Sequence, residues 1–204
     1  VDEHTLMAIG VLHAIERGEM KEDMPLATEI LQNMPSRRVL YVALLCHDLA
    51  KGQGVHHADQ GAVIAARVAR RLGLSEGETD ICAWLVRHHL LFTHAAFKRD
   101  AEDPQTVYDF VREVRSVERL RLLLVLTVAD MRAVGPGIWN AWKATLLRAL
   151  FRKAETYIRT GRIGDGVEAA ALRESVRAVL EVEAPSQAEH YLALAGSDYL
   201  ASLT

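Results

Sequence analysis

The chain has 204 residues, half of them apolar and a quarter charged, with a formal net charge of −3 at pH 7. That length suits one globular domain with a sizeable core, although length alone also permits two small domains. The near-neutral charge argues against a basic surface that binds nucleic acid or an anionic membrane. We expect a cytoplasmic protein, because the first residues resemble a helix rather than a secretory signal. The two cysteines, Cys46 and Cys82, lie in apolar helical patterns that are typical of buried free thiols.

Almost every segment follows the period of an amphipathic helix, so the predicted fold class is all-α. The first residues begin one helix, and Ser36 can cap a second that runs to about Ala50. A third helix is predicted over 58–72, and a fourth over 75–89 begins with a capping box at Ser75.

The second half of the chain continues in the same way. Asp103-Pro104 predicts a helix start, because proline suits the first helical position. Further helices are predicted over 117–134, 138–160, 167–182 and 186–195. Gly161 ends the helix predicted over 138–160. We therefore expect residues 1–160 to form the domain, and 161–204 to form a helical tail that packs on it or leads to a further domain.

Charged residues follow the most apolar segments. The stretches 39–46 and 122–129 are apolar on all sides, which predicts central helices. Asp48 follows the first and Asp130 the second, at helix ends where the dipole favours a cation. A buried carboxylate is costly unless something compensates it. Histidines also fall at helix edges, at positions 4, 57, 88 and 89. A divalent metal ion would compensate the carboxylates and take the imidazoles as ligands.

The order His4, His47-Asp48, Asp130 resembles that of the HD metal-dependent phosphohydrolase superfamily. A longer set of motifs is similar to the HD domain of the bacterial bifunctional PII uridylyltransferase/uridylyl-removing enzymes, over roughly residues 1–160. These motifs are VDEHT (1–5), HDLAKGQG (47–54), WLVRHHLL (84–91), KRDAEDP (98–104), LTVAD (126–130) and WNAWKATLLRAL (139–150).

The resemblance implies an HD-domain helical bundle with a divalent-metal site at the ends of the central helices. It implies a phosphodiesterase that removes UMP from a uridylylated tyrosine of the PII nitrogen-signalling protein. PII would be the substrate and partner, and UMP the product. The nucleotidyltransferase and ACT domains of that family are not expected in this chain, and neither is uridylyl transfer or glutamine control.

The resemblance also implies a set of site residues. His4, His47, Asp48 and Asp130 would bind one ion, and Asp48 could bridge to a second ion completed by His57, His88 and His89. The family match favours His89 over His88, whereas helical spacing does not decide between them. His57 is preferred to His56 because only His57 has the His-x-x-x-Gly spacing. Such ligands suit Mn²⁺ or Mg²⁺, with Fe²⁺ as a further candidate.

Two basic residues would act on the phosphate. Lys51 would stabilise charge that develops on its oxygens. Arg99 would add a bidentate contact, or else be a solvated surface charge. His13, His94 and His190 are interpreted as ordinary structural histidines. Two other functions stay open: a phosphohydrolase acting on free nucleotides, and a regulatory HD domain without turnover.

Overall fold

The computed structural model describes residues 2–34, 37–52, 57–101, 103–135 and 137–161, except the side chains of Asp2 and His57. Within these ranges the secondary structure is helical and contains no β-strand, which confirms the all-α fold class. The helices are α1 (Asp2–Glu16), α2 (Pro25–Gln32), α3 (Arg38–Cys46), α4 (His57–Arg71), α5 (Glu76–Arg87), α6 (Leu91–Lys98), α7 (Pro104–Val114), α8 (Val117–Val134) and α9 (Ala141–Thr160). None of these helices combines the length and apolar character needed to cross a membrane.

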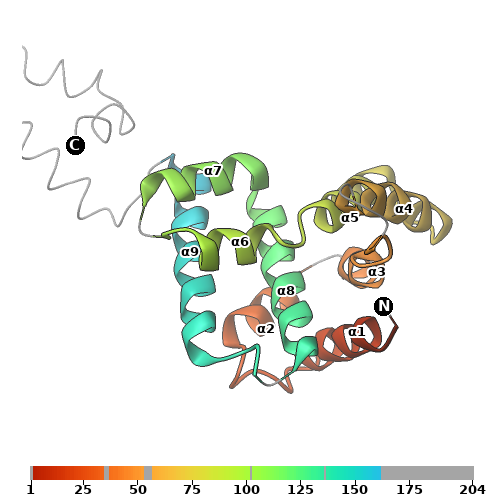
Figure 1. Cartoon of the computed structure of the whole chain (residues 1–204), viewed down its shortest axis with the longest axis horizontal. Coiled ribbons are helices and arrows are strands. Elements are labelled where there is room, and N and C mark those ends of the chain that lie inside the picture. The colour runs from red at the N-terminus through yellow and green to blue at the C-terminus, as the bar shows by residue number, and fades with distance from the viewer. Residues whose placement is uncertain (1, 35–36, 53–56, 102, 136, 162–204) are drawn as a thin grey trace, which may run out of the picture.

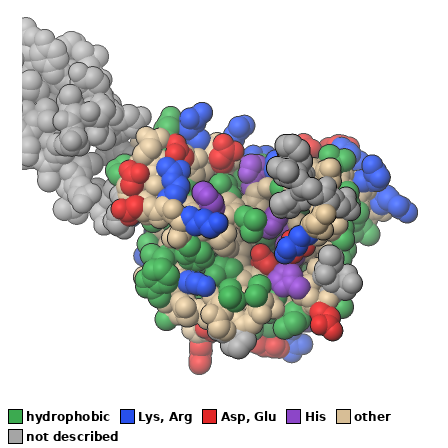
Figure 2. Space-filling model, viewed as in Figure 1, with side chains coloured by type: hydrophobic (Ala, Val, Ile, Leu, Met, Phe, Trp, Pro, Cys, Tyr) green, Lys and Arg blue, Asp and Glu red, His purple; other side chains and the backbone are tan. Residues whose placement is uncertain are grey.

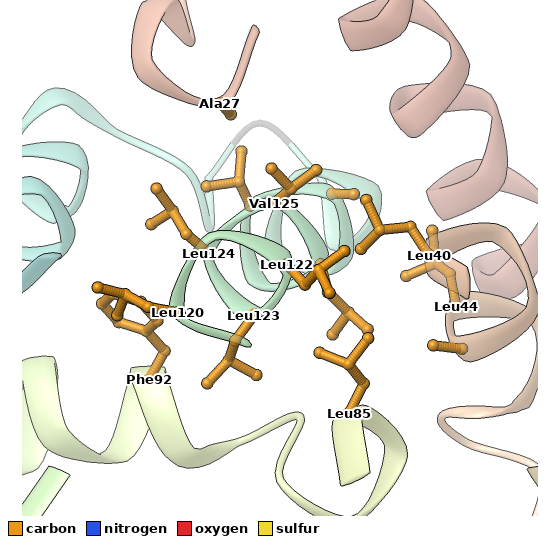
Figure 3. Close-up of a cluster of buried hydrophobic side chains, with 14 of the residues drawn as sticks. Ala27, Leu40, Leu44, Leu85, Phe92, Leu120, Leu122, Leu123, Leu124 and Val125 are labelled. Carbon is orange, nitrogen blue, oxygen red and sulfur yellow. The ribbon is translucent and has the colours of Figure 1, made fainter. Parts of the chain in front are cut away.

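Helix α8 is the centre of the fold. It packs against α1, α2, α3, α5, α6, α7 and α9, and it passes through the middle of the bundle in Figure 1. Its leucines point in several directions, as the sequence predicts for a helix that is apolar on all sides. Figure 3 shows Leu122 and Leu123 between Phe92 of α6, Leu85 of α5 and Leu40 of α3.

Most of the predicted helices are confirmed to within a few residues. The Ser75 hydroxyl accepts from the Glu78 backbone N–H at 3.3 Å, and the Glu78 carboxylate accepts from the Ser75 backbone N–H at 2.9 Å, so the capping box is formed. Asp103 caps α7 and Asn140 caps α9. Gly161 ends α9 in the left-handed conformation, with a φ of 70°. The short helices α2 and α6 are not predicted by the sequence patterns.

The helix predicted to run to about Ala50 is wrong at its end, because α3 stops at Cys46. The chain continues from 47 to 52 in turns, in which the Lys51 N–H donates to the Asp48 carbonyl at 3.0 Å. The predicted Ser36 cap and the two helices predicted in the tail, over 167–182 and 186–195, lie outside the described residues.

A polar contact joins α1 to the start of α3. The Glu16 carboxylate accepts from the Tyr41 hydroxyl and from the Arg37 guanidinium, both at 2.6 Å. These hydrogen bonds, that of Tyr41 first, hold the pKa of Glu16 below its usual value.

We expect Glu16→Gln to lower the free energy of unfolding by about 1 kcal/mol at pH 7. Because the folded-state pKa is depressed, the carboxylate contributes this stability above its unfolded pKa of about 4.3, and the contribution is lost as the pH falls through the folded pKa. Urea unfolding of both proteins from pH 7 to pH 3 tests this. A difference that stays constant down to pH 3 would contradict it.

Candidate metal centre

His47 and Asp48 follow directly on the buried helix α3, so both side chains start inside the protein. The two residues are only 4% and 8% exposed. The His47 Nδ1–H donates to the Leu44 carbonyl at 2.6 Å, one of the carbonyls left unpaired at a helix end. A carbonyl only accepts, so the proton lies on Nδ1, and Nε2 of the neutral ring carries a lone pair.

Helices α1 and α8 contribute the next two residues that lie beside His47. His4 lies in the first turns of α1, and Asp130 lies one turn before the end of α8. The His4 Nε2 lies 2.9 Å from the Asp130 Oδ1, and the His47 Nε2 lies 3.5 Å from the same oxygen. The rings of His4 and His47 meet edge to face at 5.4 Å. Residues 126 positions apart therefore meet at one point, with His47 between them.

His89 approaches from the end of α5. It is 4% exposed, and its Nε2 lies 4.0 Å from the Asp48 Oδ1. Its Nδ1–H donates to the Val86 carbonyl at 2.8 Å, which repeats the arrangement of His47. The ring centroids of the two histidines are 5.5 Å apart.

The neighbouring His88 points elsewhere. Its ring stacks on the Trp84 indole at 5.0 Å, and the Arg119 guanidinium lies over the same indole. Of the two doublet histidines, the structure brings His89 to the cluster and places His88 against α5 itself.

The charges of the cluster influence each other. Burial alone would lower the pKa of His47, but the hydrogen bonds that its protonated ring donates to Asp130 and to the Leu44 carbonyl raise it. Burial would raise the pKa of Asp130, but His47 first, and then His4 and His89, hold it below its usual value. Burial lowers the pKa of His89 and so favours its neutral form. A neutral imidazole beside ionised carboxylates is the state that binds a metal ion.

The donor set fits a divalent cation. His4, His47 and Asp48 each offer one ligand atom, and these atoms lie within 4.8 Å of one another. Asp130 and His89 stand at contact distance from this trio. Two of the imidazoles are fixed by hydrogen bonds to backbone carbonyls, an arrangement that commonly orients metal-ligating histidines. Mixed nitrogen and oxygen donors suit Mn²⁺, Fe²⁺ or Mg²⁺.

The other predicted site residues lie at three places. The Lys51 ammonium donates to the Asp48 Oδ2 at 2.6 Å, while 67% of the Lys51 side chain is exposed, so this cation stands at the mouth of the cluster. Arg99 lies elsewhere and forms an ion pair with Asp109 of α7 at 2.9 Å. The backbone of His57 begins α4, and its ring lies outside the described residues. Figure 2 shows histidine, acidic and basic side chains on one face of the molecule.

Residues 1–132 match the family described as HD domain. The curated relatives of this chain include bifunctional uridylyltransferase/uridylyl-removing enzymes from several bacteria. That of Azospirillum brasilense is 52% identical over 95% of this chain and 21% of the relative. That of Novosphingobium aromaticivorans is 53% identical over 89% of this chain and 20% of the relative. That of Cereibacter sphaeroides is 54% identical over 79% of this chain and 17% of the relative. The chain thus spans about a fifth of the length of these relatives.

Proposed function

The chain belongs to the HD domain family, and from that premise we propose that it is the uridylyl-removing part of a bifunctional enzyme. The reaction is the metal-dependent hydrolysis of the phosphodiester that joins UMP to a tyrosine of the PII signal protein. PII is the substrate and UMP the product. The names and identities of the relatives support uridylyl removal as the reaction, and PII as the substrate follows from the family resemblance.

One observation carries the proposal. Imidazole and carboxylate groups from α1, the end of α3, the end of α5 and α8 converge at a buried point, although up to 126 residues separate them in sequence. Burying ionisable groups is costly, and the convergence of several such groups at one point is typical of a functional site.

We assign the ion to His4, His47, Asp48 and Asp130, with Mn²⁺ or Mg²⁺ ahead of Fe²⁺. The His89 Nε2 lies 4.0 Å from the Asp48 Oδ1, and His89, Asp48 and His57 would hold a second ion. His88 is left out of this ligand set because its ring stacks on Trp84.

When bound, the ion supplies Lewis-acid chemistry and lowers the pKa of a water molecule to about 7. The chain's own residues do the rest. Asp48 and Asp130 balance the positive charge, and the carbonyls of Leu44 and Val86 keep the histidine rings oriented. The Lys51 ammonium, at the mouth, stabilises negative charge that develops on the phosphate oxygens. The tyrosyl leaving group has a pKa of about 10, so it departs without a strong general acid.

The test is release of UMP. The purified chain is incubated with uridylylated PII and Mn²⁺, and UMP is measured by chromatography. We expect release that depends on the metal and stops on addition of EDTA. Release that continues unchanged after complete metal removal would contradict the proposal, since the site would then act without its ion.

The same assay separates the two other functions. A panel of free nucleotides is offered alongside uridylylated PII. Turnover of free nucleotides, with none of uridylylated PII, would identify a general nucleotide phosphohydrolase. If no substrate is hydrolysed although Mn²⁺ still binds, the chain would be a regulatory HD domain.

A further inference from the structure

The two oxygens of the Asp48 carboxylate have different neighbours. The Oδ2 accepts a hydrogen bond from the Lys51 ammonium at 2.6 Å, and it lies 3.8 Å from the His47 Nε2. The Oδ1 lies 4.0 Å from the His89 Nε2. Lys51 and His47 therefore approach the same oxygen of Asp48, while His89 approaches the other.

The oxygen that Lys51 and His47 share is also the one that a metal ion would need. The His47 Nδ1–H donates to the Leu44 carbonyl, so the Nε2 of the neutral ring carries the lone pair. Two metal–ligand bonds of about 2.1 Å each, the length typical of Mg²⁺ sites, span at most about 4.2 Å. The 3.8 Å between the His47 Nε2 and the Asp48 Oδ2 lies within this span. An ion that takes the His47 Nε2 as a ligand would therefore meet Asp48 at Oδ2, the oxygen that Lys51 holds.

Lys51 reaches this oxygen from the solvent side. Its backbone N–H donates to the Asp48 carbonyl at 3.0 Å, which closes the turn between the two residues. Asp48 is only 8% exposed, whereas 67% of the Lys51 side chain is exposed. Within the part of the chain that the structure describes, Asp48 is the only residue with which Lys51 forms an ion pair. The turn therefore holds an exposed cation beside a buried carboxylate.

A metal ion and the ammonium would compete for this oxygen on unequal terms. An ion pair with an exposed partner is weak, because water solvates the ammonium and the long side chain loses entropy when it is held. A divalent ion carries twice the charge and gains the imidazoles as further ligands. Positive charges a few ångströms apart also repel each other. We therefore expect that binding of the ion breaks the hydrogen bond from Lys51 to Asp48.

We propose that the Lys51 ammonium competes with the metal ion for the Asp48 Oδ2, and that binding of the ion frees the ammonium for the substrate phosphate. The second half of this inference rests on the proposed function, which brings the phosphate to the mouth of the cluster, where Lys51 lies. Lys51 thus has two anionic partners in succession, the Asp48 carboxylate before the ion binds and the phosphate afterwards. Its charge acts on the phosphate only in a site that is loaded with metal.

Metal affinity, measured without substrate, tests the competition. The purified chain and its variants are titrated with Mn²⁺ by calorimetry. We expect the dissociation constant to be about tenfold smaller in Lys51→Met, because the competing charge is lost while much of the aliphatic stem is kept. Loss of a ligand or damage to the fold would change the affinity in the opposite direction, so the sign separates competition from a structural role. An unchanged or larger dissociation constant in Lys51→Met would overturn the inference.

Two further variants are the controls. Lys51→Arg keeps a positive charge at the mouth, so its Mn²⁺ affinity should lie closer to that of the parent than to that of Lys51→Met. Lys21→Met removes the same charge from an exposed turn after the end of α1, and the axis of α1 from His4 to Glu16 is ~18 Å long. This variant should bind Mn²⁺ like the parent. Equal gains in affinity in Lys21→Met and Lys51→Met would overturn the inference, since the effect would then reflect net charge alone.

Release of the ammonium is measured by NMR. The lysine side chains are labelled with ¹⁵N, and the Lys51 Nζ signal is identified by its absence in Lys51→Arg. On titration with Mg²⁺, which is diamagnetic, we expect this signal to move towards that of the exposed Lys21, while the Lys21 signal stays in place. A Lys51 signal that does not move, although Mg²⁺ shifts the amide signals of His47 and Asp48, would overturn the inference.

The inference and the proposed function can fail separately. Tighter Mn²⁺ binding by Lys51→Met, in a chain that does not hydrolyse uridylylated PII, supports the competition and contradicts the proposed function. Hydrolysis by the parent chain, with unchanged Mn²⁺ affinity in Lys51→Met, does the reverse. If both hold, Lys51→Met should bind Mn²⁺ more tightly and yet have a kcat about a hundredfold lower, because the cation that stabilises charge on the phosphate is missing.

Discussion

Replacing Asp48 or His47 by alanine is expected to abolish hydrolysis of uridylylated PII and to weaken Mn²⁺ binding by at least about a hundredfold. Loss of a residue outside the ligand shell commonly costs 10–100-fold, and a direct ligand should cost at least as much. The effect should be large because the His47 Nε2 lies within 4 Å of both carboxylates of the cluster. Calorimetric titration with Mn²⁺ measures the affinity, and UMP release measures the activity.

The control is His13→Ala, which removes an imidazole whose side chain is 61% exposed and lies near Glu16 rather than in the cluster. This variant should keep both metal affinity and activity. All three variants should retain the helical circular dichroism signal, because neither Asp48 nor His47 belongs to the apolar core. Wild-type Mn²⁺ affinity in a folded Asp48→Ala protein would show that the cluster is not the metal site.

The second large effect concerns the centre of the bundle. Leu123 of α8 is fully buried and contacts several helices (Figure 3). Leu123→Ala should lower the free energy of unfolding by about 3 kcal/mol, since it removes apolar contacts and leaves a cavity. For a chain of this size the melting temperature should fall by about 10 °C. Thermal and urea unfolding both measure the change.

Leu72→Ala makes the same chemical change at a position that is 55% exposed, just after α4. Its free energy of unfolding should stay within about 0.5 kcal/mol of the parent value. If the two variants lose equal stability, α8 is not the hub that its burial indicates.

The central position of α8 could be predicted from sequence, because the run over 122–129, in which only Thr127 is polar, is too apolar for a protein surface. The same pattern placed Asp48 and Asp130 at the ends of buried segments, where the structure indeed has them. The short helices α2 and α6 escaped prediction. Each has only eight residues and lacks a side-chain cap, so its helical state depends on packing, of α2 against α1 and α8 and of α6 against α7, α8 and α9.

The choice between His88 and His89 shows the limit of periodicity. Helix α5 ends at Arg87, and His88 has a φ of −109°, outside the helical range. Helical periodicity therefore cannot decide between His88 and His89, because the helix ends at Arg87, before the first of the two. The position of Arg99 was equally hidden, because its partner Asp109 comes from an antiparallel neighbour and not from the same helix.

The two carboxylates of the cluster lie on backbone segments of different stability. Asp130 projects from the most enclosed helix of the bundle, whose opening would require most of the fold to come apart. Asp48 belongs to a run of turns that includes the exposed Lys51 and Gly52 and can shift without that penalty. When ions of different radius bind, we therefore expect the Asp48 carboxylate to change position, while the Asp130 carboxylate stays in place.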